Sequence, residues 1–216
     1  MKKKGLKVAV CIPARDTMVA STAFDLARMA AYDAKNRNGS LAFYTVSSTL
    51  IFDARERLAQ AALKDGADVI LWIDSDMRFP KDLVEIMLSR NVPILGVNAV
   101  TRQKPAFPTA KNFVMVEDGV GQWMKVDSRG KTGLEKVTAV GCGVQMTRRE
   151  VFDKTPPNWF EFMKVKGGQW VGEDVYFCIK AFDAGFDTYV DHDLTAHIGH
   201  VGQWDFRWED VEEVTN

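Results

Sequence analysis

An acidic pair follows an apolar run in the segment "VILWIDSDMRF", where Asp74 and Asp76 come directly after the residues from Val69 to Ile73. Carboxylate oxygens bind hard divalent cations, and two residues that are two positions apart point to the same side of a strand that continues. In open α/β sheets, ligands bind at the carboxyl ends of the strands. The pair is therefore a candidate cation site. The alternative is that both aspartates are turn or capping residues ahead of the helix expected in "FPKDLVEIML".

A second acidic pair, Glu173 and Asp174, stands in "GGQWVGEDVYFCIKAFDAGF" at the start of a predicted amphipathic helix that Gly185 should end. Acidic residues are favoured at helix N-termini, so capping is again an alternative. A carboxylate here could also accept a proton from an acceptor hydroxyl. The neighbouring Trp170 and the glycines at 167, 168 and 172 favour a binding site with a tight backbone.

All three histidines of the chain, His192, His197 and His200, lie in "YVDHDLTAHIGHVGQW". Such a cluster indicates a metal ligand, because neutral imidazole binds transition metals. The spacing does not match the helical H-E-x-x-H motif, so a zinc site made of histidines alone is less well supported.

Composition indicates one folded domain, because 216 residues with 46% hydrophobic and 26% charged side chains can bury a substantial core. The formal net charge of -1 gives no general electrostatic reason to bind nucleic acid or an anionic membrane. We expect no membrane span and no signal peptide, since "MKKK" is followed by Gly5 and a strand-like segment. The three widely spaced cysteines fit reduced thiols, so a cytoplasmic location is expected.

Strands and helices alternate over the first hundred residues, which predicts a mostly parallel sheet flanked by helices. Beyond about residue 101, strand-like pieces broken by glycine turns between residues 113 and 137 predict antiparallel hairpins, so the sheet should become mixed. Asp53 is the expected cap of the second helix. The predicted strands are 7–14, 41–47, 68–73 and 94–100, and the predicted helices are 22–37, 53–66 and 81–90.

In their order, these motifs resemble the nucleotide-sugar-dependent glycosyltransferases of GT-A fold, especially the compact inverting, family 2-like type. The matching segments are "CIPARD", "DARERLAQAAL", "WIDSDMRFP" as the Asp-x-Asp motif, "GCGVQMTRREVF", "GED" as the x-Glu-Asp motif, and "HIGH". The resemblance implies a Rossmann-like α/β fold in a single domain, 1–216. Residues 1–101 would form the nucleotide-binding half and residues 102–216 the acceptor-binding half.

The resemblance also implies roles for individual residues. Asp174 would be the catalytic base, with Glu173 beside it. The cation, Mn²⁺ or Mg²⁺, would be held by Asp74, Asp76 and His197. Arg57 is an alternative to Arg55 for the nucleotide contact, because Glu56 stands where relatives often have asparagine. The residues placed against the nucleotide are Pro13, Ala14, Arg15, Arg55, Asp74, Ser75 and Asp76.

The predicted function is metal-dependent transfer of a sugar, with inversion, from a UDP- or GDP-type donor to a hydroxyl of a glycan, lipid or small molecule. Trp123, Trp170, Trp204 and Trp208 could stack on sugar rings, although ordinary packing is the alternative. A nucleotidyltransferase is less well supported, because "PARDTMVAST" has no glycine-rich phosphate loop. A non-catalytic carbohydrate-binding or scaffold protein of the same fold is the other alternative, since fold does not imply function.

Overall fold

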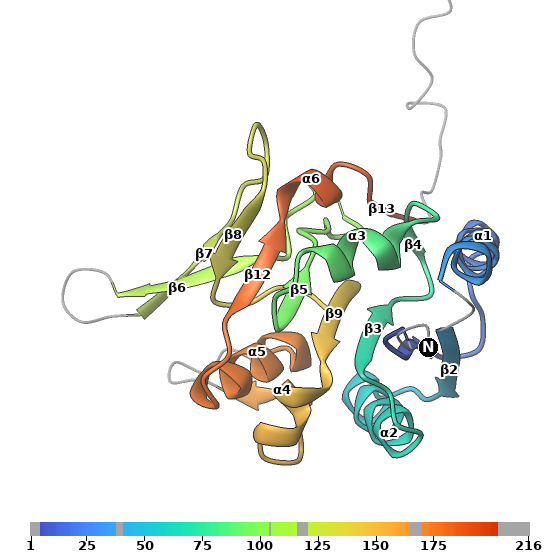
Figure 1. Cartoon of the computed structure of the whole chain (residues 1–216). Helices are drawn as coiled ribbons and strands as arrows, with labels where there is room; N and C mark the ends of the chain where they lie inside the picture. Colours follow the sequence, from blue (N-terminus) through green and yellow to red (C-terminus); the bar gives the residue numbers. More distant parts are fainter. Residues whose placement is uncertain (1–4, 38–40, 104, 116–120, 165–169, 203–216) are drawn as a thin grey trace, which may run out of the picture.

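The computed structural model describes residues 5–37, 41–103, 105–115, 121–164 and 170–202, which form an α/β fold around one central sheet (Figure 1). In chain order the elements are β1 (Val8–Ala14), α1 (Ala20–Asn36), β2 (Leu41–Ser47), α2 (Ile51–Lys64), β3 (Val69–Ile73), β4 (Met77–Arg78), α3 (Leu83–Ser89), β5 (Ile94–Gly96), β6 (Lys111–Met115), β7 (Gly121–Lys125), β8 (Leu134–Val137), β9 (Val144–Arg148), α4 (Arg149–Lys154), β10 (Met163–Lys164), β11 (Trp170–Val171), α5 (Glu173–Asp183), β12 (Thr188–Asp191), α6 (His192–Thr195) and β13 (Gly199–His200).

The central sheet has seven strands in the order β2-β1-β3-β9-β5-β12-β8. Strand β1 is parallel to β2 and β3, and β5 is parallel to β12. Strand β9 lies between β3 and β5 and is antiparallel to both, while β8 is antiparallel to β12 at the edge. The predicted mixed, mostly parallel sheet is therefore confirmed.

Helices cover both faces of the sheet, which explains the uninterrupted apolar run of β3. Val69, Leu71 and Ile73 pack into a core that includes residues of α1 and α3. Ile70 and Trp72 pack into a second core that includes residues of α2, α4 and α5. Figure 1 shows these two sets of helices on opposite sides of the sheet. A side chain on either face of β3 is therefore buried, and only the end of the strand can present groups to a ligand.

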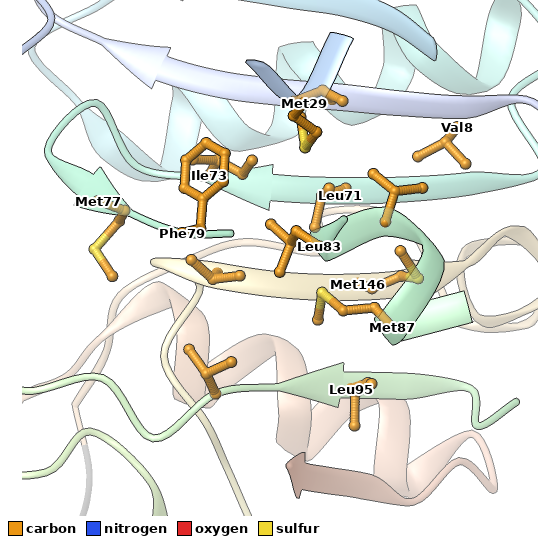
Figure 2. Close-up of a cluster of buried hydrophobic side chains, with 14 of the residues drawn as sticks. Val8, Met29, Leu71, Ile73, Met77, Phe79, Leu83, Met87, Leu95 and Met146 are labelled. Atoms are coloured by element: carbon orange, nitrogen blue, oxygen red, sulfur yellow. The ribbon is translucent and has the colours of Figure 1, made fainter. Parts of the chain in front are cut away.

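The core on the α1 and α3 side contains long, flexible side chains (Figure 2). Met29 from α1 and Leu83 and Met87 from α3 are almost completely buried against the strands. Full burial of such a side chain stabilises the fold by roughly 1.5 to 3 kcal/mol, so this core fixes the position of β3 and of the turn that follows it.

Several element boundaries differ from the prediction. Asp53 does not cap α2, because the helix begins two residues earlier at Ile51, with Leu50 at the N-cap position and Asp53 in the first turn. Helix α3 is shorter than expected at both ends. Strand β5 ends at Gly96 rather than at residue 100, because the Asn98 side chain bonds to Ala110 N–H and Val126 carbonyl and draws the chain out of the sheet.

Antiparallel pairing in the second half is confirmed, but only part of it forms hairpins. Strands β6 and β7 pair with each other as predicted. Strand β8 pairs instead with β12 and completes the central sheet, so the region from 113 to 137 is divided between a hairpin and the sheet edge. Two further small sheets join β10 to β11 and β13 to β4. Among the described helices, none has the length and apolar character needed to cross a membrane.

Candidate active site

The turn after β3 holds the first acidic pair. Strand β3 ends at Ile73, and the chain then folds back, with Asp74 N–H donating to the Gly143 carbonyl at 2.9 Å and Met77 N–H donating to the Asp74 carbonyl at 3.3 Å. Because the strand does not continue, the two carboxylates do not share one side, and each has its own partners. Of the alternative, the turn position is confirmed for both aspartates, whereas neither caps a helix, since Asp82 is the N-cap residue of α3.

Asp74 is joined to the second acidic pair by a buried arginine. Arg55 Nη2 donates to Asp74 Oδ1 at 2.8 Å, and Arg55 Nε donates to Glu173 Oε1 at 3.1 Å. The arginine side chain is only 3% exposed and packs over Trp72, with 5.5 Å from its Cζ to the ring centroid. Burial alone would lower the pKa of Arg55, but the charges of Asp74 and Glu173 outweigh it and raise the pKa.

This position differs from the contact expected for Arg55. The side chain lies behind the two acidic pairs, and its Nη1 is buried without a hydrogen-bond partner among the described residues. Its contact with a nucleotide therefore remains a prediction. The alternative, Arg57, is 57% exposed and forms an ion pair with Asp53 at 3.5 Å on the outer face of α2.

Asp76 lies beside a histidine and an arginine. Its Oδ1 is 3.3 Å from His200 Nε2, and its Oδ2 accepts from Arg102 Nη1 at 2.7 Å. The other ring nitrogen of His200 lies 2.6 Å from the Val100 carbonyl, so Nδ1 carries a proton and donates it there. Burial raises the pKa of Asp76, but His200 and Arg102 outweigh this effect and the net pKa is lowered. The bond to Asp76 in turn raises the pKa of His200.

The pairing of β13 with β4 explains why His200 is the histidine at Asp76. His200 lies opposite Met77 in this small sheet, and Val201 N–H donates to the Asp76 carbonyl at 2.8 Å. His197, the predicted metal ligand, is exposed on the turn after α6, and its N–H donates to the Leu194 carbonyl. The structure thus brings His200, and not His197, to the acidic pair.

The donor set at Asp76 fits a transition-metal cation. Carboxylate and imidazole are a suitable combination for Mn²⁺. Arg102 is 53% exposed, so its ion pair with Asp76 is weak and can be displaced. Within the part of the chain that the structure describes, no group of three or more His, Cys, Asp or Glu side chains could hold a metal ion. The protein therefore offers two ligands here, and donor phosphate oxygens or water have to complete the coordination.

Asp174 lies in the first turn of α5, one residue after Glu173. Gly172 is the N-cap residue and makes no side-chain cap bond, so neither acid is the cap. Asp174 Oδ1 accepts from Val175 N–H at 2.7 Å. Burial, followed by the charge of Glu173, raises the pKa of Asp174 to about 6. A carboxylate with this pKa is suited to accept a proton near neutral pH.

The turn from Gly141 to Gly143 lies between the two acidic pairs. A Cβ atom at Gly141 would lie 3.1 Å from Thr109 Cβ and 3.5 Å from Asp174 Oδ2. A Cβ atom at Gly143 would lie 3.6 Å from Asp74 Oδ2. The two glycines therefore let the backbone pass close to both carboxylates. Asp74 and Asp174, which are 100 positions apart in the chain, thus lie against the same turn.

The loop after β1 is attached to the same site. Val19 N–H donates to the Ser75 carbonyl at 2.9 Å, which ties this loop to the turn containing Asp74 and Asp76. Pro13 is buried, Ala14 is half-buried, and Arg15 is 76% exposed beside Asp16. These residues and Ser75 thus gather at the carboxyl ends of β1 and β3, where they were predicted to contact a nucleotide.

The tryptophans occupy different environments. Trp170 is 68% exposed and lies just before α5, whereas Trp123 is half-buried against Phe113, with ring centroids 5.1 Å apart. Trp204 and Trp208 lie outside the described residues, as do the glycines at 167 and 168. Among the tryptophans that the structure describes, Trp170 is therefore the better placed to stack on a sugar near Asp174.

Comparison with known proteins gives a structural result but no sequence match. No family model matches the chain, and no curated protein matches it. The glycosyltransferase GalNAc-T7, in a crystal structure with UDP, GalNAc and Mn²⁺, superposes with a TM-score of 0.58 at 13% identity. This chain has a GT-A-like fold. The match covers 92% of this chain but 44% of the GalNAc-T7 chain.

The viral protein A197 from STIV is also similar in structure. It superposes with a TM-score of 0.52 at 14% identity, over 97% of this chain and 100% of A197. At these identities both comparisons describe the fold alone. A shared fold does not fix the chemistry, which depends on the residues of this chain.

Proposed function

We propose that this protein is a metal-dependent glycosyltransferase that transfers a sugar from a UDP- or GDP-type donor to an acceptor hydroxyl with inversion. The observation that carries the proposal is that one carboxylate of each acidic pair, Asp74 and Asp174, lies against the Gly141–Gly143 turn, next to the carboxyl end of β3. Support for the donor class comes from the fold shared with GalNAc-T7, which was crystallised with UDP and Mn²⁺.

In this proposal the residues have separate roles. Asp76 and His200 would hold the cation, which would supply positive charge against the leaving diphosphate. Pro13, Ala14, Arg15 and Ser75, in the half formed by residues 1–101, line the nucleotide. His200 takes the place that the sequence resemblance had given to His197. The metal-ligand role predicted for Asp74 is not used in this proposal, since its Oδ1 accepts from Arg55.

Asp174 is the proposed base. Its pKa of about 6 leaves most of the carboxylate ionised at neutral pH while keeping it basic enough to accept the proton of the acceptor hydroxyl. The hydroxyl oxygen then attacks the anomeric carbon from the face opposite the diphosphate, which inverts that carbon. Glu173 acts through Arg55 and Asp74, because it is bonded to the arginine. Its role is to position the two acidic segments relative to each other.

The test is calorimetric titration of UDP and GDP, each with and without Mn²⁺, against the wild type and Asp76→Ala. The proposal expects one nucleotide to bind only with Mn²⁺ and this binding to fall at least tenfold in the variant. Asp153→Ala is the control, since Asp153 is an exposed carboxylate on α4 whose partner is Arg149. If neither nucleotide binds under any condition, the non-catalytic scaffold is the better description.

A further inference from the structure

A second concave site lies beside the candidate active site. It is a pocket of 790 Å³, formed by the segment after β5, the segment joining β7 to β8, and α6. In Figure 1 the β7–β8 connection and α6 both lie in the upper part of the view. Val100 belongs to both sites, because it lines the pocket and its carbonyl accepts from His200. Pro108, also in the lining, precedes Thr109, which lies against Gly141 of the active site.

The floor of this pocket is a buried hydrogen-bond network. Asn98 Nδ2 donates to Ser128 Oγ and to the Val126 carbonyl, both at 2.8 Å. Ser128 Oγ is 2.9 Å from His192 Nδ1, and His192 Nε2 is 2.8 Å from Glu135 Oε2. Asn98 and His192 are each only 3% exposed. The network ties the β7–β8 segment to α6, so the pocket is held open in one shape before any ligand arrives.

The wall and rim carry an excess of positive charge. Lys125, Arg129 and Lys131 line the pocket with a single carboxylate, Asp127, which gives a formal charge of +2 in a chain whose net charge is -1. Glu135, which accepts from Lys131 Nζ at 2.6 Å, reduces the local excess to +1. A cationic pocket on an acidic protein favours an anionic ligand over a neutral one.

Two of these cations are positioned to meet a ligand. Arg129 uses Nε and Nη2 to bind Asp127, which fixes the guanidinium while its Nη1 makes no bond to a described residue. Lys125 has no ion pair with a carboxylate in the described part of the chain, and its Nζ lies 3.3 Å from the Phe107 ring centroid. Phe107 and Pro108 add an apolar wall that can cover the C–H face of a sugar ring.

We propose that this pocket is the acceptor subsite and that it binds a sugar carrying a carboxylate or phosphate group. The assignment rests on the proposed glycosyltransferase function, because only a transferase needs an acceptor site next to Asp76 and Asp174. The apolar wall meets the ring, and Lys125 and Arg129 meet the anionic group. The side chain of Arg129, 92% exposed, can pair with such a group at the mouth of the pocket.

The experiment titrates glucuronic acid, glucose 6-phosphate and glucose into the metal-free protein at fixed ionic strength, followed by ¹⁵N–¹H NMR shifts. The acidic sugars are expected to bind at least tenfold more tightly than glucose and to shift the amides of Ser128 and Arg129. Comparison of the two acidic probes shows whether the site prefers carboxylate or phosphate. The variant Lys125→Gln/Arg129→Gln should lose at least tenfold in affinity for the preferred probe.

The control variant is Lys35→Gln/Lys64→Gln, which removes the same charge from two exposed helix ends and should keep wild-type affinity. Equal binding of glucose and the acidic sugars, or full affinity in Lys125→Gln/Arg129→Gln, overturns the assignment. Displacement of the acidic sugar by UDP or GDP also overturns it, because the pocket would then belong to the donor site. Nucleotide binding is measured on separate portions of the same preparations with Mn²⁺ added, so absence of that binding alone counts against the proposed function and not against the pocket.

Discussion

Removal of the buried arginine should separate the two acidic segments. Arg55 is 3% exposed and donates to both Asp74 and Glu173, so Arg55→Met keeps the bulk of the side chain but leaves two carboxylates without their partner. The Glu173 side chain is 11% exposed and Asp74 is 30% exposed, so Glu173 is the carboxylate that cannot recover its bonds from water. We expect the variant to fold with reduced stability. The segments that carry Asp74 and Glu173 should no longer be held in one fixed arrangement.

The size of the effect follows from the burial. Breaking a buried ion pair from one side costs roughly 3 to 5 kcal/mol, and the partial exposure of Asp74 places the expected loss near the lower limit, about 3 kcal/mol. For a domain of this length, that loss corresponds to a melting temperature lower by roughly 6 to 12 °C. Arg55→Met/Glu173→Gln removes the unpaired buried charge and should recover at least about 1 kcal/mol of the loss.

The assay is urea unfolding followed by circular dichroism at pH 7.5, with thermal melting as a second measure. Arg57→Met is the matched control on the same helix, because its ion pair with Asp53 is exposed and is worth only about 0.5 kcal/mol. A loss below about 1 kcal/mol for Arg55→Met, or no recovery in the double variant, would refute the view that Arg55 holds the two acidic segments together.

Other predictions test the base, the metal ligands and the core. The pKa of Asp174 is raised to about 6, and the ionised form is the base. Single-turnover rates should therefore rise with pH through about 6 and then level off. A flat rate profile between pH 5 and 7.5 contradicts this role. Burial also disfavours the charged form of Asp174, so Asp174→Asn should raise the melting temperature at pH 8, where the carboxyl is ionised. The increase should be much smaller at pH 4, near the ordinary pKa of 3.8, because the buried carboxyl is then protonated. His200→Ala should weaken Mn²⁺ binding at least tenfold by calorimetry and His197→Ala should not; the reverse order would restore the original assignment. Gly96→Ala should cost roughly 1 to 3 kcal/mol in urea unfolding, because the added Cβ would lie 2.5 Å from Val140 Cγ1; wild-type stability would show that this contact relaxes freely.

Much of the fold follows from local patterns in the sequence. The unbroken apolar run from Val69 to Ile73 predicts a strand covered on both faces, and the two separate cores confirm it. Glycine turns in the second half predict the antiparallel pairing of β6 with β7. The position of β9 between β3 and β5 could not be predicted, because strand order depends on contacts between segments that are far apart in the chain.

The types of residue at the candidate site could be predicted from the sequence, but the contacts between individual side chains could not. Asp74 was expected at the end of a buried strand and Asp174 at the start of a helix, and in the structure both carboxylates lie against the Gly141–Gly143 turn. The choice of His200 over His197 depends on the register of β13 with β4, two strands of two residues each with no periodic signal. The buried position of Arg55 is likewise set by Glu173, which lies 118 positions away. Nothing in the local sequence around Arg55 indicates that partner.

The most direct test of the central claim is donor turnover by Asp174→Asn. Release of UDP or GDP from the matching nucleotide sugar is measured with Mn²⁺ and a panel of acidic and neutral sugar acceptors. Asp183→Asn, an exposed carboxylate of the same helix, is the control. The account predicts that Asp174→Asn loses at least a hundredfold in turnover while it binds nucleotide as the wild type does, and that the control keeps full activity. Wild-type turnover in Asp174→Asn would contradict the claim that the two acidic pairs form one catalytic site.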